Sequence, residues 1–464
     1  MDARTRRALA VGAVLLAAAL ALVGLRSRAQ AWLLADRAGD PTPPWPPAQG
    51  QGLAPATRVR VVLIDGLGLA EARRIGALNR FCASGIDLVI DAGFPTVSLP
   101  VQHELWTGET PQQSGVRLGN RHRATPAGAI PARVPHSVAV VESHPSIAGS
   151  FGFERLVEPP AGTFEQAAGE ALRGKARLVF VHVLRVDTAG HRTGAASPEY
   201  QLAAAQAGRM LAQWHGPVEP GDRWIVLADH GHLPGGGHKG SEHAVRFVRA
   251  CISGALEGWT GPVTGRVHMV DLSRALADSL GLVLAPPAAG RPLVAAIADP
   301  RPDATLPRVT PARWGAAAAA LLLALAFTVL MARRRGWSYP WWVVVTGAAV
   351  VMVAGVPSLS SMPGGRTLLA AAAPGTVLLA VAIWRELRHG VDPLRLAAAQ
   401  LALPLALLVA APIAAGGPAA VVPHVTAATV ELSELLVIVC AVAGAVTIAA
   451  GVVTAAGTRP AAPL

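Results

Sequence analysis

The chain has 464 residues, and its basic residues outnumber its acidic ones, 40 Lys and Arg against 29 Asp and Glu. Long uncharged apolar runs occur only at its two ends, with arginines beside them, so the positive charge fits membrane topology and speaks against a nucleic-acid partner. Three cysteines, none of them in a Cys-x-x-Cys pair, speak against a disulfide framework, a thiol redox site and a cysteine zinc site.

The first apolar run covers residues 8–25, directly after Arg4, Arg6 and Arg7. At ~1.5 Å per residue it is just long enough to cross a hydrocarbon layer of ~30 Å. A cleaved signal peptide looks similar, but Arg26 and Arg28 follow without a clear small-residue cleavage site, which favours a retained anchor. We therefore expect residues 1–28 to form a cytoplasmic tip and a transmembrane helix, and residues 29–56 a stiff Pro-rich linker.

The middle of the chain, residues 57–300, alternates between two patterns. Residues 59–64, 178–184 and 224–228 are short, mostly apolar runs of strand length, whereas 70–84, 163–173 and 198–214 have the composition of helices. This alternation predicts an α/β domain with a mostly parallel sheet. Ligands of such sheets bind beyond the carboxyl ends of the strands.

A second linker, 301–312, leads to residues 313–464, where five apolar runs predict a transmembrane region at about 315–332, 341–359, 367–384, 396–415 and 435–456. With the N-terminus inside, the arginine-rich loops 333–335 and 385–395 both fall on the cytoplasmic side. The sequence thus predicts a multi-pass protein of the cell (inner) membrane, in contact with membrane lipid. Both termini are expected in the cytoplasm and the middle domain outside it.

Two of the three cysteines fall in that middle domain. Cys440 lies within an apolar run, so Cys82 and Cys251 are the pair that could bridge outside the cell. Free cysteines are often small buried side chains, and we expect these two to be such residues rather than a disulfide.

Each of the three expected strands is followed within a few residues by an aspartate, at Asp65, Asp187 and Asp229. Because parallel strands end at one edge, these carboxylates should converge. Histidines accompany them, and these are His191, His230 and, after a Gly-rich turn, His238. One Asp/His pair could be a capped turn, but three strand-end carboxylates with histidines beside them indicate a divalent metal site.

Ser98 stands just before Pro100 and an amphipathic run that ends at Gly108, where a helix should begin. The free N–H groups and the positive end of the dipole at a helix start favour a bound phosphate and an alkoxide. Ser98 could be only an N-cap, but beside a metal cluster we expect it to be the nucleophile. Thr96 and Thr107 are weaker candidates.

These motifs resemble the alkaline phosphatase superfamily, in particular its phosphodiesterase/nucleotide pyrophosphatase branch and the related glycosylphosphatidylinositol ethanolamine-phosphate transferases. The matching pieces are the Asp-Gly opening at Asp65, the Pro-Thr-x-Ser-x-Pro stretch around Ser98 leading to Thr107-Gly108, Asp-x-x-Gly-His at 187–191, Asp-His-Gly at 229–231, Gly-His-x-Gly at 237–240 and the stretch 270–282. Their order agrees over nearly all of residues 57–300.

The resemblance implies a three-layer α/β domain and two divalent metal ions, with zinc expected and manganese as the alternative. It implies one metal held by Asp187, His191 and His238, and a second held by Asp65, Asp229, His230 and the Ser98 oxygen. It further implies an asparagine that steadies the phosphoryl oxygen. Asn120 is the nearest match, offset by one residue, and Arg121 and Arg123 either assist it or belong to a solvated loop.

The sequence departs from the superfamily pattern after the motif proline. Val101 and Gln102 stand where the branch usually has Asn-His, and His103 is displaced by one position. Sulfatase relatives require an arginine in Cys/Ser-x-Pro-x-Arg, and Gln102 occupies that place. This difference argues against a sulfatase.

Three functions follow as hypotheses. The first is a membrane-bound phosphodiesterase or phosphatase that acts outside the cytoplasm on a phosphate ester, free or lipid-linked, through a phospho-serine intermediate. The second is a phosphoethanolamine-type transferase that moves a phospho-head group from a lipid to a glycan or glycolipid. The third is a catalytically inactive scaffold or binding protein, which the intact set of candidate ligands disfavours.

Overall fold

The computed structural model describes residues 3–34, 39–42, 45, 50, 52–83, 85–116, 122–216, 221–240, 242–254, 263–300, 380–381, 384–385, 387, 389, 441 and 444–453. The chain divides into two compact units. One is Leu34–Leu306 with Ser358–Ser361, and the other comprises Met1–Leu33, Pro307–Pro357 and Met362–Leu464. The first unit contains the expected catalytic domain 57–300, and each unit is described by itself.

Helix α1 (Ala3–Leu34) is continuous over 32 residues. The linker expected from residue 29 therefore begins later, because no proline or glycine interrupts 29–34. Within its unit α1 packs closely on residues 444–453, since a Cβ added at Gly12 would lie 2.5 Å from Ile448 Cγ1. Close approach of this kind requires small residues at the contact.

No helix within the described ranges combines the length and the apolar composition needed to span a membrane. The span expected at residues 8–25 falls within α1, so this finding does not support it. Of the five C-terminal runs, 315–332, 341–359 and 396–415 lie outside the described residues, and only short parts of 367–384 and 435–456 lie inside them.

The unit Leu34–Leu306 is built on an eight-stranded sheet of order β4-β3-β5-β1-β6-β7-β2-β8. In chain order the strands are β1 (Arg58–Ile64), β2 (Ile86–Asp91), β3 (Ser137–Val141), β4 (Arg155–Val157), β5 (Leu178–Val183), β6 (Asp222–Leu227), β7 (Phe247–Gly254) and β8 (Val263–His268). Strand β7 is antiparallel to its neighbours β6 and β2, and the other strand pairs of the described sheet are parallel. The expected mostly parallel sheet is confirmed.

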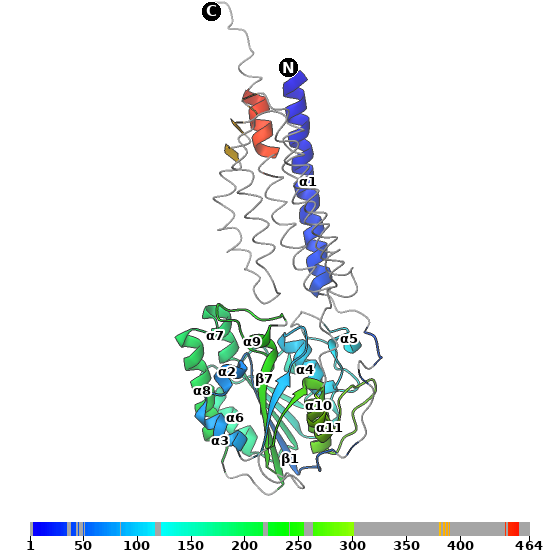
Figure 1. Cartoon of the computed structure of the whole chain (residues 1–464), viewed down its shortest axis with the longest axis vertical. Coiled ribbons are helices and arrows are strands. Elements are labelled where there is room, and N and C mark those ends of the chain that lie inside the picture. Colours follow the sequence, from blue (N-terminus) through cyan, green and yellow to red (C-terminus); the bar gives the residue numbers. More distant parts are fainter. Residues whose placement is uncertain are drawn as a thin grey trace, which may run out of the picture. The chain divides into compact units, whose positions relative to one another are not determined.

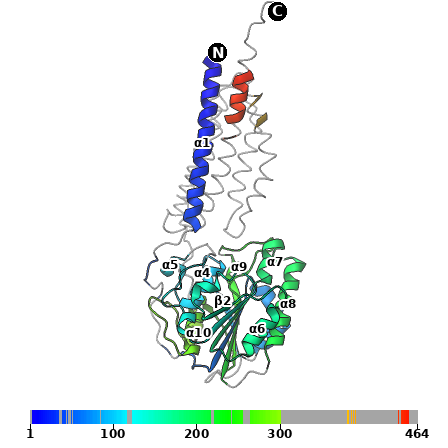
Figure 2. The same cartoon turned by 180° about the vertical axis from the view of Figure 1, so that it is seen from behind.

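Helices cover both faces of this sheet, as Figures 1 and 2 show. One side carries α2 (Leu69–Ala72), α3 (Gly76–Ala83), α6 (Phe164–Arg173), α7 (Arg185–Thr193) and α8 (Pro198–Trp214), and the other carries α4 (Ser98–Thr107), α10 (Met269–Leu280) and α11 (Leu293–Ala298). The short elements are α5 (Pro111–Ser114), α9 (His243–Arg246), η1 (Pro131–Arg133) and η2 (Ala148–Phe151). The three-layer α/β architecture expected from the resemblance is therefore present.

The helix expected at 70–84 is two helices, α2 and α3, separated by a turn at 73–75. The turn brings the side chains of Ile75 and Leu78 into the core, where 7% and 3% of their surfaces are exposed. Burial of these apolar groups outweighs the hydrogen bonds that a continuous helix would add.

Arg60 of β1 is a fully buried cation in a strand that reads as apolar. Its guanidinium donates to the carbonyl oxygens of Leu172 (2.7 Å), Gly174 (2.8 Å) and Ala176 (2.8 Å), at and just beyond the end of α6. These carbonyls are the ones that a helix leaves without intrahelical donors, so Arg60 ties the end of α6 to the central strand.

The two cysteines of this unit form a disulfide, Cys82–Cys251, which joins α3 to β7. The expectation of two separate buried thiols is therefore wrong, although both side chains are buried as expected. The pairing depends on where α3 lies against the sheet, which the two positions in the sequence do not reveal.

Candidate active site

Three neighbouring parallel strands, β5, β1 and β6, end at one edge of the sheet, and each leads into an aspartate. Asp65 follows β1, Asp229 follows β6, and Asp187 lies in the first turn of α7 after β5. Asp65 and Asp229 are 1% and 0% exposed. The three carboxylates converge as the strand ends predict.

A glycine after Asp65 makes this convergence sterically feasible. Gly66 has φ +73°, and a Cβ there would lie 2.7 Å from the Asp187 Cα. Any other residue would both strain the backbone and push α7 away. The Gly66 N–H also donates to Asp229 Oδ1 (3.2 Å), as does the His230 N–H (2.9 Å), so the Asp229 carboxylate has a fixed orientation.

His230 lies beside both of the buried carboxylates. Its Nε2 is 3.3 Å from Asp65 Oδ1 and 3.8 Å from Asp229 Oδ2. Its ring stacks on that of His238, with centroids 3.8 Å apart. Asp65, Asp229 and His230 thus form one cluster whose ligand atoms lie within 4.8 Å of one another.

The second cluster gathers imidazoles around Asp187. Asp187 Oδ1 lies 2.9 Å from His232 Nε2, 3.5 Å from His191 Nε2 and 3.8 Å from His238 Nε2. His191 and His238 face each other, with their Nε2 atoms 3.0 Å apart. Asp187, His230, His232 and His238 offer ligand atoms within 4.8 Å of one another. The structure therefore brings together all six predicted Asp and His ligands.

Ser98 joins this group from the other side of the sheet. It is the first residue of α4, after the extended N-cap Val97, and only 4% of its surface is exposed. Its Oγ lies 3.2 Å from His230 Nε2. The hydroxyl thus stands at a helix N-terminus, where negative charge is stabilised, and next to the Asp65 cluster.

Thr96 ties the segment that carries Ser98 to the loop that carries His238. Its hydroxyl donates to the Gly240 carbonyl (2.9 Å) and accepts from the Lys239 N–H (3.0 Å), while its carbonyl oxygen lies 2.7 Å from His238 Nδ1. With Nδ1–H donating to that carbonyl, His238 Nε2 is left bare to face the cluster. Thr96 has a positioning role here, and the Thr107 hydroxyl is likewise engaged, donating to the His103 carbonyl at 2.7 Å.

Burial controls the charge of this site. It raises the pKa of Asp65 well above the ordinary value, and the nearby carboxylates of Asp229 and Asp187 raise it further. Burial also raises the pKa of Asp229 and lowers those of His191 and His238. It would raise the pKa of Asp187 too, but the His232 hydrogen bond and the neighbouring imidazoles lower it overall. Without a bound cation, the site therefore disfavours the simultaneous ionisation of all three carboxylates.

A divalent cation would remove this conflict, and the side chains fit one. Asp65 Oδ1 and Asp229 Oδ2 are buried and have no hydrogen-bond partner among the described residues. Within the same ranges the ion pairs of these aspartates go only to histidines, never to Arg or Lys. Carboxylate oxygens with neutral imidazoles are ligands that zinc and similar ions take. Among the described residues, two candidate metal-binding clusters thus meet at His230.

No family model matches the chain, and no curated protein matches its sequence. Among solved structures, murine ectonucleotide pyrophosphatase/phosphodiesterase 5 matches at 14% identity, over 49% of this chain and 96% of its own, with a TM-score of 0.40. A Vibrio parahaemolyticus protein of the alkaline phosphatase superfamily matches at 14% identity, over 66% and 80%, with a TM-score of 0.38.

The lipoteichoic acid synthase LtaP from Listeria monocytogenes matches at 10% identity, over 51% of this chain and 75% of its own, with a TM-score of 0.38. These matches have TM-scores below 0.5, so the resemblance to the alkaline phosphatase superfamily stays a prediction from the sequence. At these identities the likeness concerns the fold alone. These matches do not test the layout of membrane helices that the resemblance implies.

The asparagine that the resemblance implies as a support of the phosphoryl oxygen falls in a part of the chain that the structure does not describe. Asn120 and Arg121, the residues expected near that role, lie outside the described residues. Arg123 is described, and its backbone N–H donates to Ser150 Oγ at 2.9 Å. The roles of Asn120 and Arg121 stay predictions.

Two buried histidines of the candidate site were not predicted from the sequence. His182 of β5 has its Nε2 2.7 Å from Asp65 Oδ2 and 3.4 Å from Gln102 Nε2, and burial lowers its pKa to about 3. His232, two residues after His230, contacts Asp187. A polar residue inside the apolar run 178–184 could have signalled His182, and the repeated Asp-His-Gly-His could have signalled His232.

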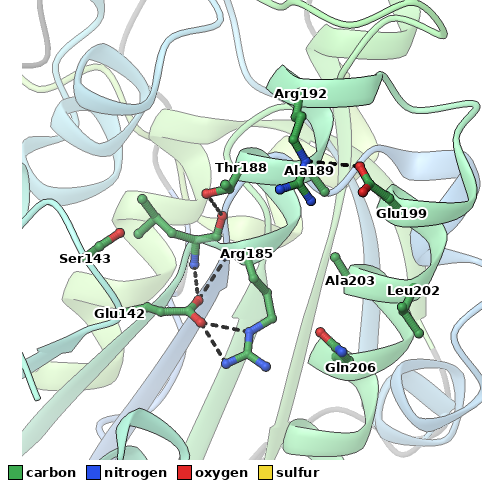
Figure 3. A pocket seen from close by; sticks show the side chains of 11 residues that line it. Glu142, Ser143, Arg185, Thr188, Ala189, Arg192, Glu199, Leu202, Ala203 and Gln206 are labelled. Carbon is green, nitrogen blue, oxygen red and sulfur yellow. Dashed lines mark hydrogen bonds and ion pairs between the residues drawn. The ribbon is translucent and has the colours of Figure 1, made fainter. Parts of the chain in front are cut away.

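A pocket of about 480 Å³ lies on the face of α7 next to the one that carries the ligands. Arg185, Thr188 and Arg192, three or four residues apart, share that face, and Figure 3 shows them with Glu142 and Glu199 around the pocket. Each arginine is paired with a glutamate, Arg185 with Glu142 (2.7 Å) and Arg192 with Glu199 (3.1 Å). The arginines are already neutralised, so the pocket is not a ready anion site.

Proposed function

We propose that this chain transfers a phosphoryl group from a phosphate ester, with Ser98 as the nucleophile. Asp187, His191 and His238 would hold one divalent ion, and Asp65, Asp229, His230 and the Ser98 oxygen a second. The observation that carries the proposal is the Ser98 hydroxyl 3.2 Å from His230 Nε2, beside buried Asp65 and Asp229 oxygens that have no hydrogen-bond partner among the described residues.

The two ions, when bound, would stabilise the negative charge of a phosphoryl group in transfer and lower the pKa of a hydroxyl. The protein's own part is positional. The start of α4 directs backbone N–H groups and a positive dipole end toward the Ser98 oxygen. Ser98 Oγ bonds to phosphorus as the bond from phosphorus to the leaving alcohol breaks, and the proton of the Ser98 hydroxyl ends on the oxygen of that alcohol. This step leaves a phospho-serine.

In the second step an oxygen nucleophile attacks the phospho-serine and restores the Ser98 hydroxyl. With water as acceptor the chain is a phosphodiesterase or phosphatase, which we propose as the main activity. With a glycan or glycolipid hydroxyl it is a transferase of the phosphoethanolamine type. The two alternatives use the same residues and differ only in the acceptor.

Phosphate is preferred to sulfate as the substrate class because of Gln102. This residue stands where a sulfatase motif has arginine, and in the structure its amide Nε2 lies 3.4 Å from His182 Nε2, fully buried. At that place the chain therefore has a neutral amide beside His182 and no cation.

We also propose that the catalytic domain works outside the cytoplasm. The Cys82–Cys251 disulfide supports this location, because disulfides persist in oxidising compartments and are rare in the cytosol. Attachment to the membrane through the C-terminal apolar runs stays a prediction from the sequence.

The full chain, purified and supplied with zinc or manganese, tests the function. It should hydrolyse an aryl phosphodiester or phosphomonoester faster than an aryl sulfate, and a chelator should abolish turnover. A metal-loaded chain inactive on all three esters would remove the hydrolase and leave the transferase and scaffold hypotheses. Mass spectrometry of lipids and glycans from a deletion strain then identifies the acceptor. Only the loss of a transferase would leave a glycan without its phospho-alcohol group.

Ser98→Ala should lower kcat by at least about 10³-fold, because only the nucleophile is lost. Its metal content by elemental analysis should stay near that of the wild type, since all six proposed Asp and His ligands remain. Ser114→Ala, on α5, is the matched control and should keep full activity. Near-full activity of Ser98→Ala would defeat the assignment.

A further inference from the structure

We infer that His232 is a positioning residue that holds the Asp187 carboxylate in place for metal binding. The inference rests on the proposed function, because it concerns the same site, but it adds a residue outside the predicted ligand set. His232 Nε2 lies 2.9 Å from Asp187 Oδ1, the shortest of the three imidazole contacts to that carboxylate.

The surroundings of His232 show that its Nε2 carries the proton. The residue is 2% exposed, and its Nδ1 has no hydrogen-bond partner among the described residues. A neutral imidazole has one N–H, and placing that hydrogen on Nε2 makes the contact with Asp187 a hydrogen bond. The same carboxylate oxygen faces His191 and His238, so the bond fixes the orientation of an oxygen that lines the metal cluster.

Two glycines make room for this ring. A Cβ at Gly66 would lie 3.0 Å from His232 Nε2, and a Cβ at Gly190 would lie 2.3 Å from its Cδ2. At Gly190 all three nearest atoms belong to the His232 ring. Gly190 sits inside helix α7, where alanine is normally the more stable residue. The glycine of the Asp-x-x-Gly-His motif is thus explained by the space that His232 takes.

Substitution of His232 separates positioning from ligation. His232→Leu removes the donor but keeps the volume, and we expect it to weaken binding of one of the two ions about 10–100-fold in chelator competition. His232→Gln can place its Nε2–H close to the same point and should recover most of that affinity. The matched control is His215→Leu, because His215 packs between Phe81 and Trp224 and should leave metal binding unchanged.

Unchanged metal affinity in His232→Leu would overturn the inference. A second outcome would also overturn it, namely His232→Gln binding metal as weakly as His232→Leu while the cobalt absorption spectra of both variants show one imidazole fewer at the metal. His232 would then be a metal ligand. A wild-type chain that binds no metal would instead remove the proposed function.

A double-mutant cycle on the metal-free chain tests the packing relation independently of any activity. Gly190→Ala should lower the Tm of the wild type, because the new Cβ meets the His232 ring. In the His232→Ala background the same substitution should leave the Tm unchanged or raise it. An equal loss in both backgrounds would show that Gly190 does not serve His232.

Discussion

Asp229 is a buried carboxylate whose oxygens are only partly satisfied by the protein. Its Oδ1 accepts two backbone N–H groups, but its Oδ2 has no hydrogen-bond partner among the described residues, and burial raises the pKa of the carboxyl group. A group with a raised folded-state pKa stabilises the fold below its unfolded pKa and loses that contribution as pH rises through the folded value. Ionised Asp229 should therefore destabilise the metal-free chain at neutral pH.

Asp229→Asn should consequently make the metal-free chain more stable at pH 7, by about 1.4 kcal/mol for each unit by which the carboxyl pKa is raised. The advantage should vanish near pH 4 and grow as the pH rises. Urea denaturation of chelator-treated protein at several pH values measures it. With metal present the wild type should be more stable than the variant, because the variant lacks a charged ligand. A variant less stable than the wild type in both states would contradict this account.

Helix α7 carries Asp187 and His191, and its start is held by Glu142, just beyond β3. Glu142 Oε2 accepts the N–H groups of Leu184 (2.8 Å) and Arg185 (3.0 Å), and Oε1 accepts from Arg185 Nε (2.8 Å). A carboxylate at a helix N-terminus satisfies donors that the helix cannot and stabilises its dipole. The orientation of the two ligands thus depends on a residue 45 positions before the first of them.

Glu142→Gln should lower the free energy of unfolding by about 1 kcal/mol, because the charge at the helix start and the pair with Arg185 are lost. It should also weaken binding of one metal ion. Glu199→Gln is the control, since Glu199 of α8 pairs with Arg192 of α7 at the surface. This variant should change the free energy of unfolding by less than ~0.5 kcal/mol. Equal effects of the two variants would show that Glu142 does not support the site.

At the scale of the molecule, the Cys82–Cys251 disulfide joins residues 169 positions apart. A cross-link of this span restricts the unfolded chain, and removing a native disulfide typically costs about 2–5 kcal/mol. Thermal unfolding with and without reductant should show that loss for the wild type. The Cys82→Ala/Cys251→Ala double variant should already show the loss and should not respond to reductant. Activity below the unfolding transition should be little changed, because neither cysteine is in the metal clusters.

The strands β1, β5 and β6 and the helices α6 and α8 could be predicted from the sequence, because apolar runs of strand length and helical composition report local burial directly. The candidate ligands from Asp65 to His238 could be predicted too, since residues that follow adjacent parallel strands meet at one edge of the sheet. The Cys82–Cys251 pairing, the support of α7 by Glu142 and the contacts of His182 and His232 became visible in the folded structure alone. These features join positions far apart in the chain, and the packing of helices against the sheet, which no local pattern encodes, brings them together.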